Sequence, residues 1–279
     1  MQDPSSTTTS DLVGVGENPA LTPMSAPRDP TSWLSRNHYR STARVIGVIY
    51  LAGMVVGIGG NILIQSILSA PNPLSSIAAT SMLLGLGVVL WLTAVVGDAA
   101  HGVLMFPVLK RHSEPMALGY LSGRIMDATF VAVMALLILV QIPLGTAYLT
   151  AGTADTSTLQ TLTTVLHQAE LYAYEFGMVT LGISGLILCT VFYRTGLVPR
   201  TLALWGLVGY ALFLGGSLLQ IVGVDLSSGH VVLGGVWEGV IGVWLIAKGF
   251  KPSATVFNGS SATSTAPTST SPPMAGATT

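Results

Sequence analysis

Six long apolar runs alternate with short polar segments between residues 43 and 250. Each run is close to or longer than the roughly 20 residues that a helix needs to cross a 30 Å hydrocarbon core. Several exceed that minimum, so tilted helices or protruding ends are expected. Pro143 is expected to kink or end the third helix, because proline lacks a backbone donor. The pattern predicts an all-α fold, a six-helix transmembrane bundle, with runs at 43–70, 77–109, 116–148, 162–193, 201–224 and 231–250.

The two ends of the chain have a different character. Residues 1–37 are polar and rich in Ser, Thr, Pro and Asp, and residues 251–279 are again of low complexity. Neither stretch has enough apolar surface to offset chain entropy, so both are expected to be disordered tails. No charged segment followed directly by an apolar core opens the chain, so the first run is expected to act as an uncleaved anchor. The transmembrane domain is therefore assigned to residues 38–250.

Basic residues are confined to one side of this alternation. The eleven Lys and Arg precede or begin the first run, lie near the second-to-third and fourth-to-fifth connections, or close the sixth run. The connections at 71–75, 150–161 and 225–230 have none. Because cytoplasmic loops carry the excess of Lys and Arg, the pattern predicts that both termini are cytoplasmic.

Composition agrees with a lipid environment. Half of the residues are apolar and 8% are charged, against roughly a quarter in an average soluble domain, so a soluble helical fold is a poor alternative. The net charge of −1 gives no field that would recruit nucleic acid. The single cysteine, Cys189, excludes an internal disulfide and is interpreted as a packing residue.

Ionisable side chains inside the apolar runs are the candidate chemistry, because each costs roughly 2.5–3.5 kcal/mol to insert. At 1.5 Å per residue, Asp98, Asp127 and Glu238 lie about 15–18 Å from the basic border of three different helices. His101 and Arg124 follow or precede an acid by three residues, so each shares a helix face with it. The depths predict one intramembrane polar cluster of Asp98, His101, Arg124, Asp127 and Glu238.

This candidate cluster has two interpretations. One arginine cannot neutralise three acids, so at least one acid is expected to be protonated or to bind an ion. That is the profile of a proton or cation relay. It is equally the profile of an interhelical lock, in which buried polar groups only hold the helices together.

A second polar group lies toward the outer edge of the fourth run, and it consists of His167, Glu170, Tyr174 and Glu175. Polar and aromatic residues are common at the membrane interface, and an outer entrance is the alternative reading. No cofactor is predicted: haem needs ligands at matching depth, and zinc needs three or four converging ligands. No sequence motif of an enzyme is present, so an enzyme is the less favoured class.

Glycines recur at small-xxx-small spacings that let helices approach closely. They predict a tight bundle, with contacts either within one chain or between copies in an oligomer. The pairs are Gly53/Gly57, Gly119/Gly123 and Gly235/Gly239.

Four stretches resemble a bacterial membrane family known as domain of unknown function 4386. They are YRSTARVIGVIYL (39–51), FPVLKRHSEPMALGYLSGRIMD (106–127), YRTGLVPRTLALWGLVGY (193–210) and WLIAKGF (244–250). The resemblance implies a multi-pass protein of the bacterial cell membrane with no assigned activity. Glu238 fits the family pattern, whereas Asp127 stands where Glu is usual and is one methylene shorter.

The sequence therefore favours an integral membrane protein whose immediate partner is the lipid bilayer. The leading hypothesis is a small transporter or proton-linked protein that uses the mid-membrane carboxylates, with an unidentified small molecule or ion as ligand. The alternative is a non-catalytic structural or sensory protein in which the buried charges lock the helices.

Overall fold

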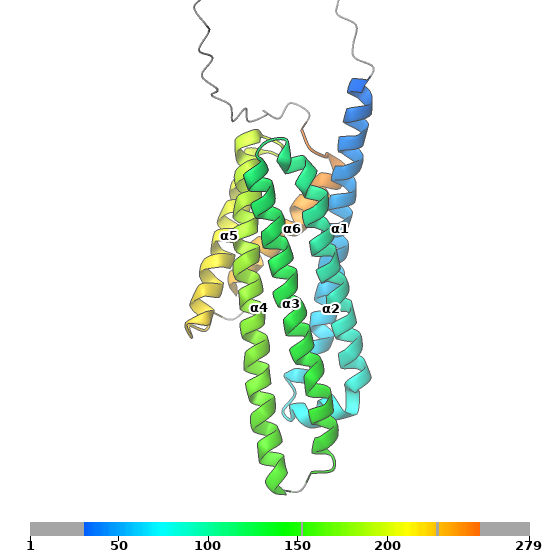
Figure 1. Cartoon of the computed structure of the whole chain (residues 1–279), viewed down its shortest axis with the longest axis vertical. Coiled ribbons are helices and arrows are strands. Elements are labelled where there is room, and N and C mark those ends of the chain that lie inside the picture. The colour runs from blue at the N-terminus through cyan, green and yellow to red at the C-terminus, as the bar shows by residue number, and fades with distance from the viewer. Residues whose placement is uncertain (1–30, 152, 227–228, 252–279) are drawn as a thin grey trace, which may run out of the picture.

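The computed structural model describes residues 31–151, 153–226 and 229–251. These residues form six long helices and no strand, and successive helices run in opposite directions (Figure 1). The prediction of an all-α, six-helix fold is thus confirmed. The helices are α1 (Thr31–Leu68), α2 (Pro73–Lys110), α3 (Glu114–Tyr148), α4 (Thr153–Thr195), α5 (Arg200–Ile221) and α6 (Gly229–Ala247).

All six helices contain a window that is long and apolar enough to cross a membrane. Many large apolar side chains, such as Val55, Met82 and Val222, point outward and are exposed. In water such a surface would drive aggregation, so it fits a bilayer that covers the sides of the bundle. The chain is a multi-pass membrane protein.

Two helices begin well before their apolar runs, and the third helix passes through a proline. α1 begins at Thr31, within the stretch assigned to the amino-terminal tail, and α4 begins at Thr153, within the expected 150–161 connection. Pro143 lies inside α3, which continues to Tyr148, so this proline does not end the helix. Residues 1–30 and 252–279 of the predicted tails lie outside the described residues.

Local sequence explains two of the sharp turns. Asn72 precedes α2, and its side chain accepts a hydrogen bond from the backbone N–H of Ser75, while Pro73 occupies the first helical position. Ser113 plays the same part before α3, because its hydroxyl accepts from the Met116 N–H. These are favoured ways to satisfy the unpaired donors of a helix start.

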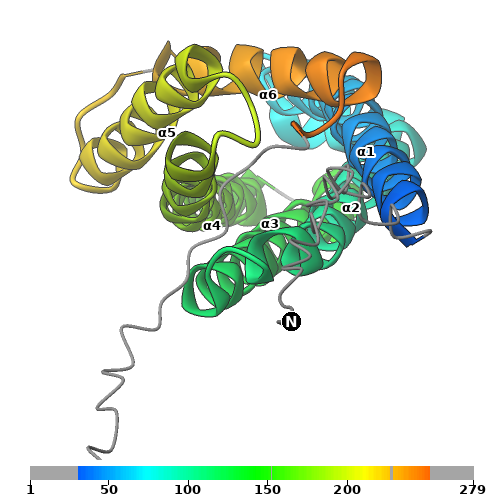
Figure 2. The same cartoon turned by 90° about the horizontal axis from the view of Figure 1, so that it is seen from above.

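The helices form a ring in chain order. Each packs against the next, and α6 returns to pack against α1 (Figure 2). Among the described elements, the only close backbone approach across the ring is a small one between α2 and α4. All six helices therefore face a common interior.

Glycine makes several of these ring contacts possible. A Cβ placed on Gly60 of α1 would lie 2.8 Å from the Gly87 carbonyl oxygen of α2, and one on Gly47 would lie 2.6 Å from the Gly242 carbonyl of α6. Such backbone-to-backbone approach is typical of membrane helices. Of the spacings noted in the sequence, Gly123 packs tightly on Ser184, whereas a Cβ on Gly53 would meet nothing within 4 Å.

The two ends of the bundle differ in charge. The basic end, at the top of Figure 1, holds the α2–α3 and α4–α5 connections, with Lys110, Arg111, Arg194 and Arg200. At the opposite end, called the far end below, the α3–α4 hairpin projects beyond the α5–α6 connection (Figure 1).

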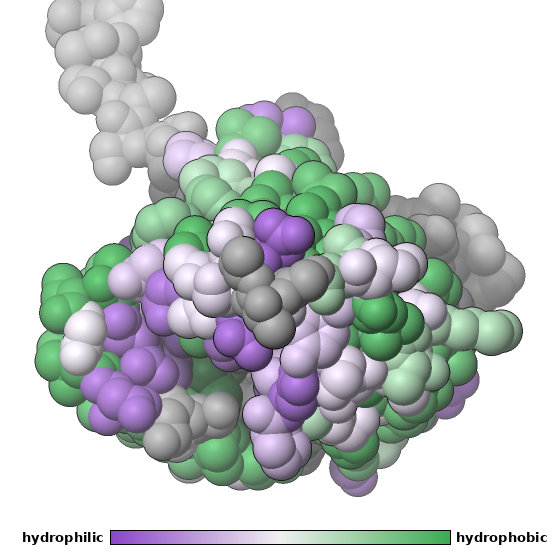
Figure 3. Space-filling view, turned by 90° about the horizontal axis from the view of Figure 1, so that it is seen from below, coloured by the Kyte–Doolittle hydropathy of each residue, from purple (hydrophilic) through white to green (hydrophobic). Residues whose placement is uncertain are grey.

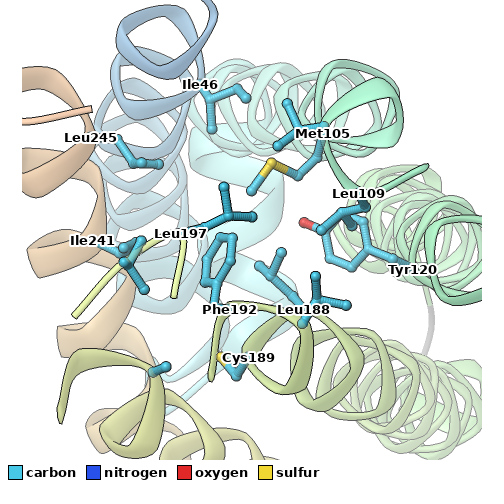
Figure 4. Close-up of a cluster of buried hydrophobic side chains, with 14 of the residues drawn as sticks. Ile46, Met105, Leu109, Tyr120, Leu188, Cys189, Phe192, Leu197, Ile241 and Leu245 are labelled. Carbon is cyan, nitrogen blue, oxygen red and sulfur yellow. The ribbon is translucent and has the colours of Figure 1, made fainter. Parts of the chain in front are cut away.

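Near the basic end the interior is filled by apolar side chains of α1, α2, α4, α6 and the α4–α5 connection, which we call the plug (Figure 4). Each of its members is at most 1% exposed. Side chains so fully covered leave little room for water among them. The plug comprises Ile46, Met105, Leu109, Leu188, Cys189, Phe192, Leu197, Ile241 and Leu245.

Candidate functional site

Arg124 on α3 is the centre of the predicted cluster. Its side chain is 2% exposed, and Nη2 donates to Asp98 Oδ1 of α2 at 2.8 Å. Nη1 lies 3.8 Å from Asp127 Oδ2, one turn along the same helix. The structure therefore joins three of the five predicted residues through ion pairs.

The two acids differ in their surroundings. The Asp98 side chain is 44% exposed, whereas Asp127 is buried. Asp127 Oδ1 and Arg124 Nε have no hydrogen-bond partner among the described residues. A buried carboxylate oxygen without a donor is costly, so this position favours a bound proton, water or cation.

His101 lies beside this ion-pair network rather than in it. It is 1% exposed, and its Nδ1 shares a hydrogen bond of 2.6 Å with the Tyr120 hydroxyl. The Tyr50 ring packs edge-on against the imidazole, with centroids 4.1 Å apart. His101 Nε2 and Tyr50 Oη have no described partner. Because α1, α2 and α3 each contribute one ring, this group couples three helices.

Glu238 enters the interior from α6. The Tyr210 hydroxyl of α5 donates to Glu238 Oε1 at 2.8 Å. No ion pair joins Glu238 to Arg124 in the described part of the chain, but the charges of Arg124 and Asp98 lie close enough to act on it. Glu238 is therefore an electrostatic neighbour of the network, held by a tyrosine rather than by the arginine.

The outer polar group divides into two separate pairs. Glu170 is buried between His167 Nδ1, 2.7 Å from its Oε1, and Gln141 Nε2, which donates to Oε2 at 2.7 Å. Glu175 faces α6 instead, where His230 Nε2 lies 3.8 Å from its Oε2. Two acids of α4 thus contact two different helices: Glu170 contacts α3 and Glu175 contacts α6.

Both acids line a cavity of about 740 Å³ near the far end. Glu170, Tyr174 and Glu175 line it, together with residues of the five other helices. From the far end, polar residues gather over the middle of the molecule and hydrophobic ones surround them (Figure 3). The lining does not include Asp98 or Glu238.

Tyr174 connects the cavity with the charge cluster. It lines the cavity, and Gly177, one turn further along the same face of α4, packs against α3. A Cβ on Gly177 would lie 3.2 Å from Asp127 Oδ1, so only glycine leaves this space beside the carboxylate. The cavity lining therefore comes within about one turn of α4 of Gly177, the residue that borders Asp127.

The polar partners of the charged residues were not predicted from the sequence. Tyr50, Tyr120 and Tyr210 read as ordinary aromatic positions in apolar runs, and Gln141 and His230 had no charged neighbour in sequence. A polar atom within an otherwise apolar run is the one signal that could have marked them. No three His, Cys, Asp or Glu side chains in the described ranges are placed to hold a metal ion.

Spanning helices, an apolar outer surface and buried ion pairs define a polytopic helical membrane protein. The chain belongs to the family described as domain of unknown function (DUF4386), whose model matches residues 45–249. This match confirms the resemblance seen in the sequence. No curated protein and no solved structure matches the chain.

Proposed function

We propose that this protein is a proton-linked transporter of the bacterial cell membrane, with the basic end in the cytoplasm. The network of Asp98, Arg124 and Asp127, with Glu238 and His101 beside it, carries the proton. Ionisable groups inside a membrane bundle commonly mark such relays, because placing them in the bilayer costs free energy and they are rare where they have no function.

One observation carries the proposal: Asp127 is buried in the middle of the bundle with an unpartnered oxygen, beside an arginine already bonded to Asp98. A group that exchanges a proton needs a site where charge is only partly compensated. A fully paired acid would hold its charge permanently.

The surrounding interior supports a direction for proton entry. The cavity at the far end reaches Tyr174, about one turn of α4 from the Gly177 that borders Asp127, while the plug fills the interior toward the basic end. With the basic end cytoplasmic by the distribution of Lys and Arg, protons would enter from outside the cell.

Proton flux into proteoliposomes tests the proposal. The full chain is reconstituted with a trapped pH-sensitive dye, and a potassium gradient with valinomycin imposes a membrane potential. The protein is expected to acidify the lumen faster than in protein-free vesicles, and Asp127→Asn to return the rate to that background. Asp155→Asn, the same change on an exposed acid of α4, is the matched control and keeps the wild-type rate.

The alternative function, a structural or sensory protein with a helix lock, predicts a different pair of results. A lock gives no flux above background in the wild type, and Asp127→Asn lowers thermal stability in detergent. Burial of Arg124 favours this reading, because breaking a buried ion pair costs about 3–5 kcal/mol. Wild-type flux at the protein-free rate would overturn the relay.

A further inference from the structure

The far-end cavity has the dimensions of a small-molecule site. Its volume of about 740 Å³ falls within the range of roughly 300–1,000 Å³ that is usual for ligand pockets. Ile64, Met134 and Ile138 give it apolar walls, and the polar side chains Asn61, Gln65 and Gln168 lie at its exposed rim. A ligand with an apolar body can therefore enter from the far end.

Charge in this cavity has one dominant sign. Three acids, Glu170, Glu175 and Asp225, contribute to the lining, and no Lys or Arg is among the described residues that do. His230 is the one titratable base in the lining. A concave surface with this balance attracts cations and repels anions.

Glu175 is the acid that is available to a ligand. It is 8% exposed, and its Oε2 accepts no hydrogen bond from the described residues; His230 Nε2 is 3.8 Å away. Glu170, by contrast, has both oxygens engaged by His167 and Gln141. A buried carboxylate oxygen that lacks a donor and borders a cavity is suited to receive a cationic group.

Aromatic rings complete the chemistry. Trp91 of α2 and Tyr172 and Tyr174 of α4 line the same cavity. Faces of Trp and Tyr attract organic cations through the ring quadrupole, an effect of about 0.5–2 kcal/mol per contact. A small metal ion would instead need several converging ligands, which the described residues do not provide.

We infer that the cavity binds a monovalent organic cation, whose charge lies against Glu175 and whose apolar body lies against the aromatic and aliphatic walls. Binding itself is independent of the proton relay. The further step, that this cation is the transported cargo, rests on the proposed function.

Binding of tetraphenylphosphonium to the purified full-length protein tests the inference. Equilibrium dialysis with the radiolabelled cation is expected to give saturable binding at one site per chain. Tetraphenylborate, which has the same shape and the opposite charge, is the matched ligand control and is expected not to compete. Loss of a buried charge partner predicts at least about tenfold weaker binding in Glu175→Gln.

Two further variants separate the site from general effects. Asp155→Asn changes a carboxylate of α4 outside the cavity and is expected to keep wild-type affinity, whereas Trp91→Leu is expected to weaken binding. Equal binding of the phosphonium and the borate, or unchanged affinity in Glu175→Gln, would overturn the inference. The thermal stability of each variant is measured as well, because a variant that keeps its melting temperature but binds less has lost the site and not the fold.

The two proposals fail in different ways. Saturable phosphonium binding without proton flux contradicts the transporter and supports the binding site. Proton flux without phosphonium binding contradicts the binding site and leaves the relay supported.

Discussion

The two halves of the bundle interior differ in kind. Toward the basic end, apolar side chains from around the ring meet on the axis, and the largest of them, such as Phe192 and Leu109, are fully buried. Toward the far end, the same ring of helices encloses a cavity of about 740 Å³ with three acids in its wall. The charge network of Arg124 lies between the two.

This difference shows that one ring of helices can be packed solid at one end and enclose a cavity at the other. A helix ring of uniform packing would be either a channel or a solid bundle. For the proposed transporter, a cavity on one side of the Arg124 network and a packed interior on the other would correspond to a carrier that is open to one side. The two halves are therefore expected to behave differently in solution.

The largest expected contrast is in access to water. Cys189 lies in the plug and is fully buried, so it is expected not to react with a membrane-impermeant maleimide. Gln168, on the same helix, is exposed at the cavity rim. A Gln168→Cys variant in a Cys189→Ser background is therefore expected to label rapidly in intact cells.

The labelling also reports orientation. Reaction of the Gln168→Cys variant only after the cells are permeabilised would place the far end in the cytoplasm and reverse the proposed topology. Rapid labelling of Cys189 in the wild-type protein would mean that the plug does not exclude water.

The next contrast is in stability, and it uses two aliphatic residues of similar size and burial. Leu188 in the plug is 1% exposed, and Ile138 in the cavity wall is 2% exposed. Leu188→Ala is expected to lower the free energy of unfolding by about 3 kcal/mol, because it leaves a void among packed atoms. Ile138→Ala should cost about 1 kcal/mol, because one side of this residue already lacks packing partners.

Unfolding in detergent by titration with dodecyl sulfate measures both values on the same protein. Equal costs at the two positions would mean that the far half is packed as densely as the plug, and the distinction between filled and hollow halves would be wrong.

The six-helix fold could be predicted from the sequence, because the length of an apolar run is tied to the thickness of the membrane. About 20 predominantly apolar residues need a helix across lipid, and six such runs predict six spanning helices. Depth counted along each helix also placed Asp98, Asp127 and Glu238 at one level, with Arg124 one turn away. The structure joins the first two acids to Arg124 by ion pairs, whereas Glu238 is bonded to Tyr210. Whether that layer carries protons stays a prediction.

Helix rotation and ring order could not be obtained in this way. Counting residues gives depth but not the direction in which a side chain points, so the partnership of Tyr210 with Glu238 and of Glu175 with His230 was missed. These pairs join helices through residues 28 and 55 positions apart, and nothing local encodes them. The cavity depends on all six helices at once, so no single segment predicts it.

The smallest expected effect concerns how the ring closes beside the plug, and two glycines of α1 test it. A Cβ on Gly47 would lie 2.6 Å from the Gly242 carbonyl, so Gly47→Ala must push α6 away from α1 and is expected to cost about 2 kcal/mol. Gly53→Ala meets nothing within 4 Å and is expected to stabilise the helix by about 0.5–1 kcal/mol. The same detergent titration measures both. A backbone contact as close as that of Gly47 has no room for a methyl group. If Gly47→Ala nevertheless cost no more stability than Gly53→Ala, the α1–α6 contact would not be what holds the filled half together.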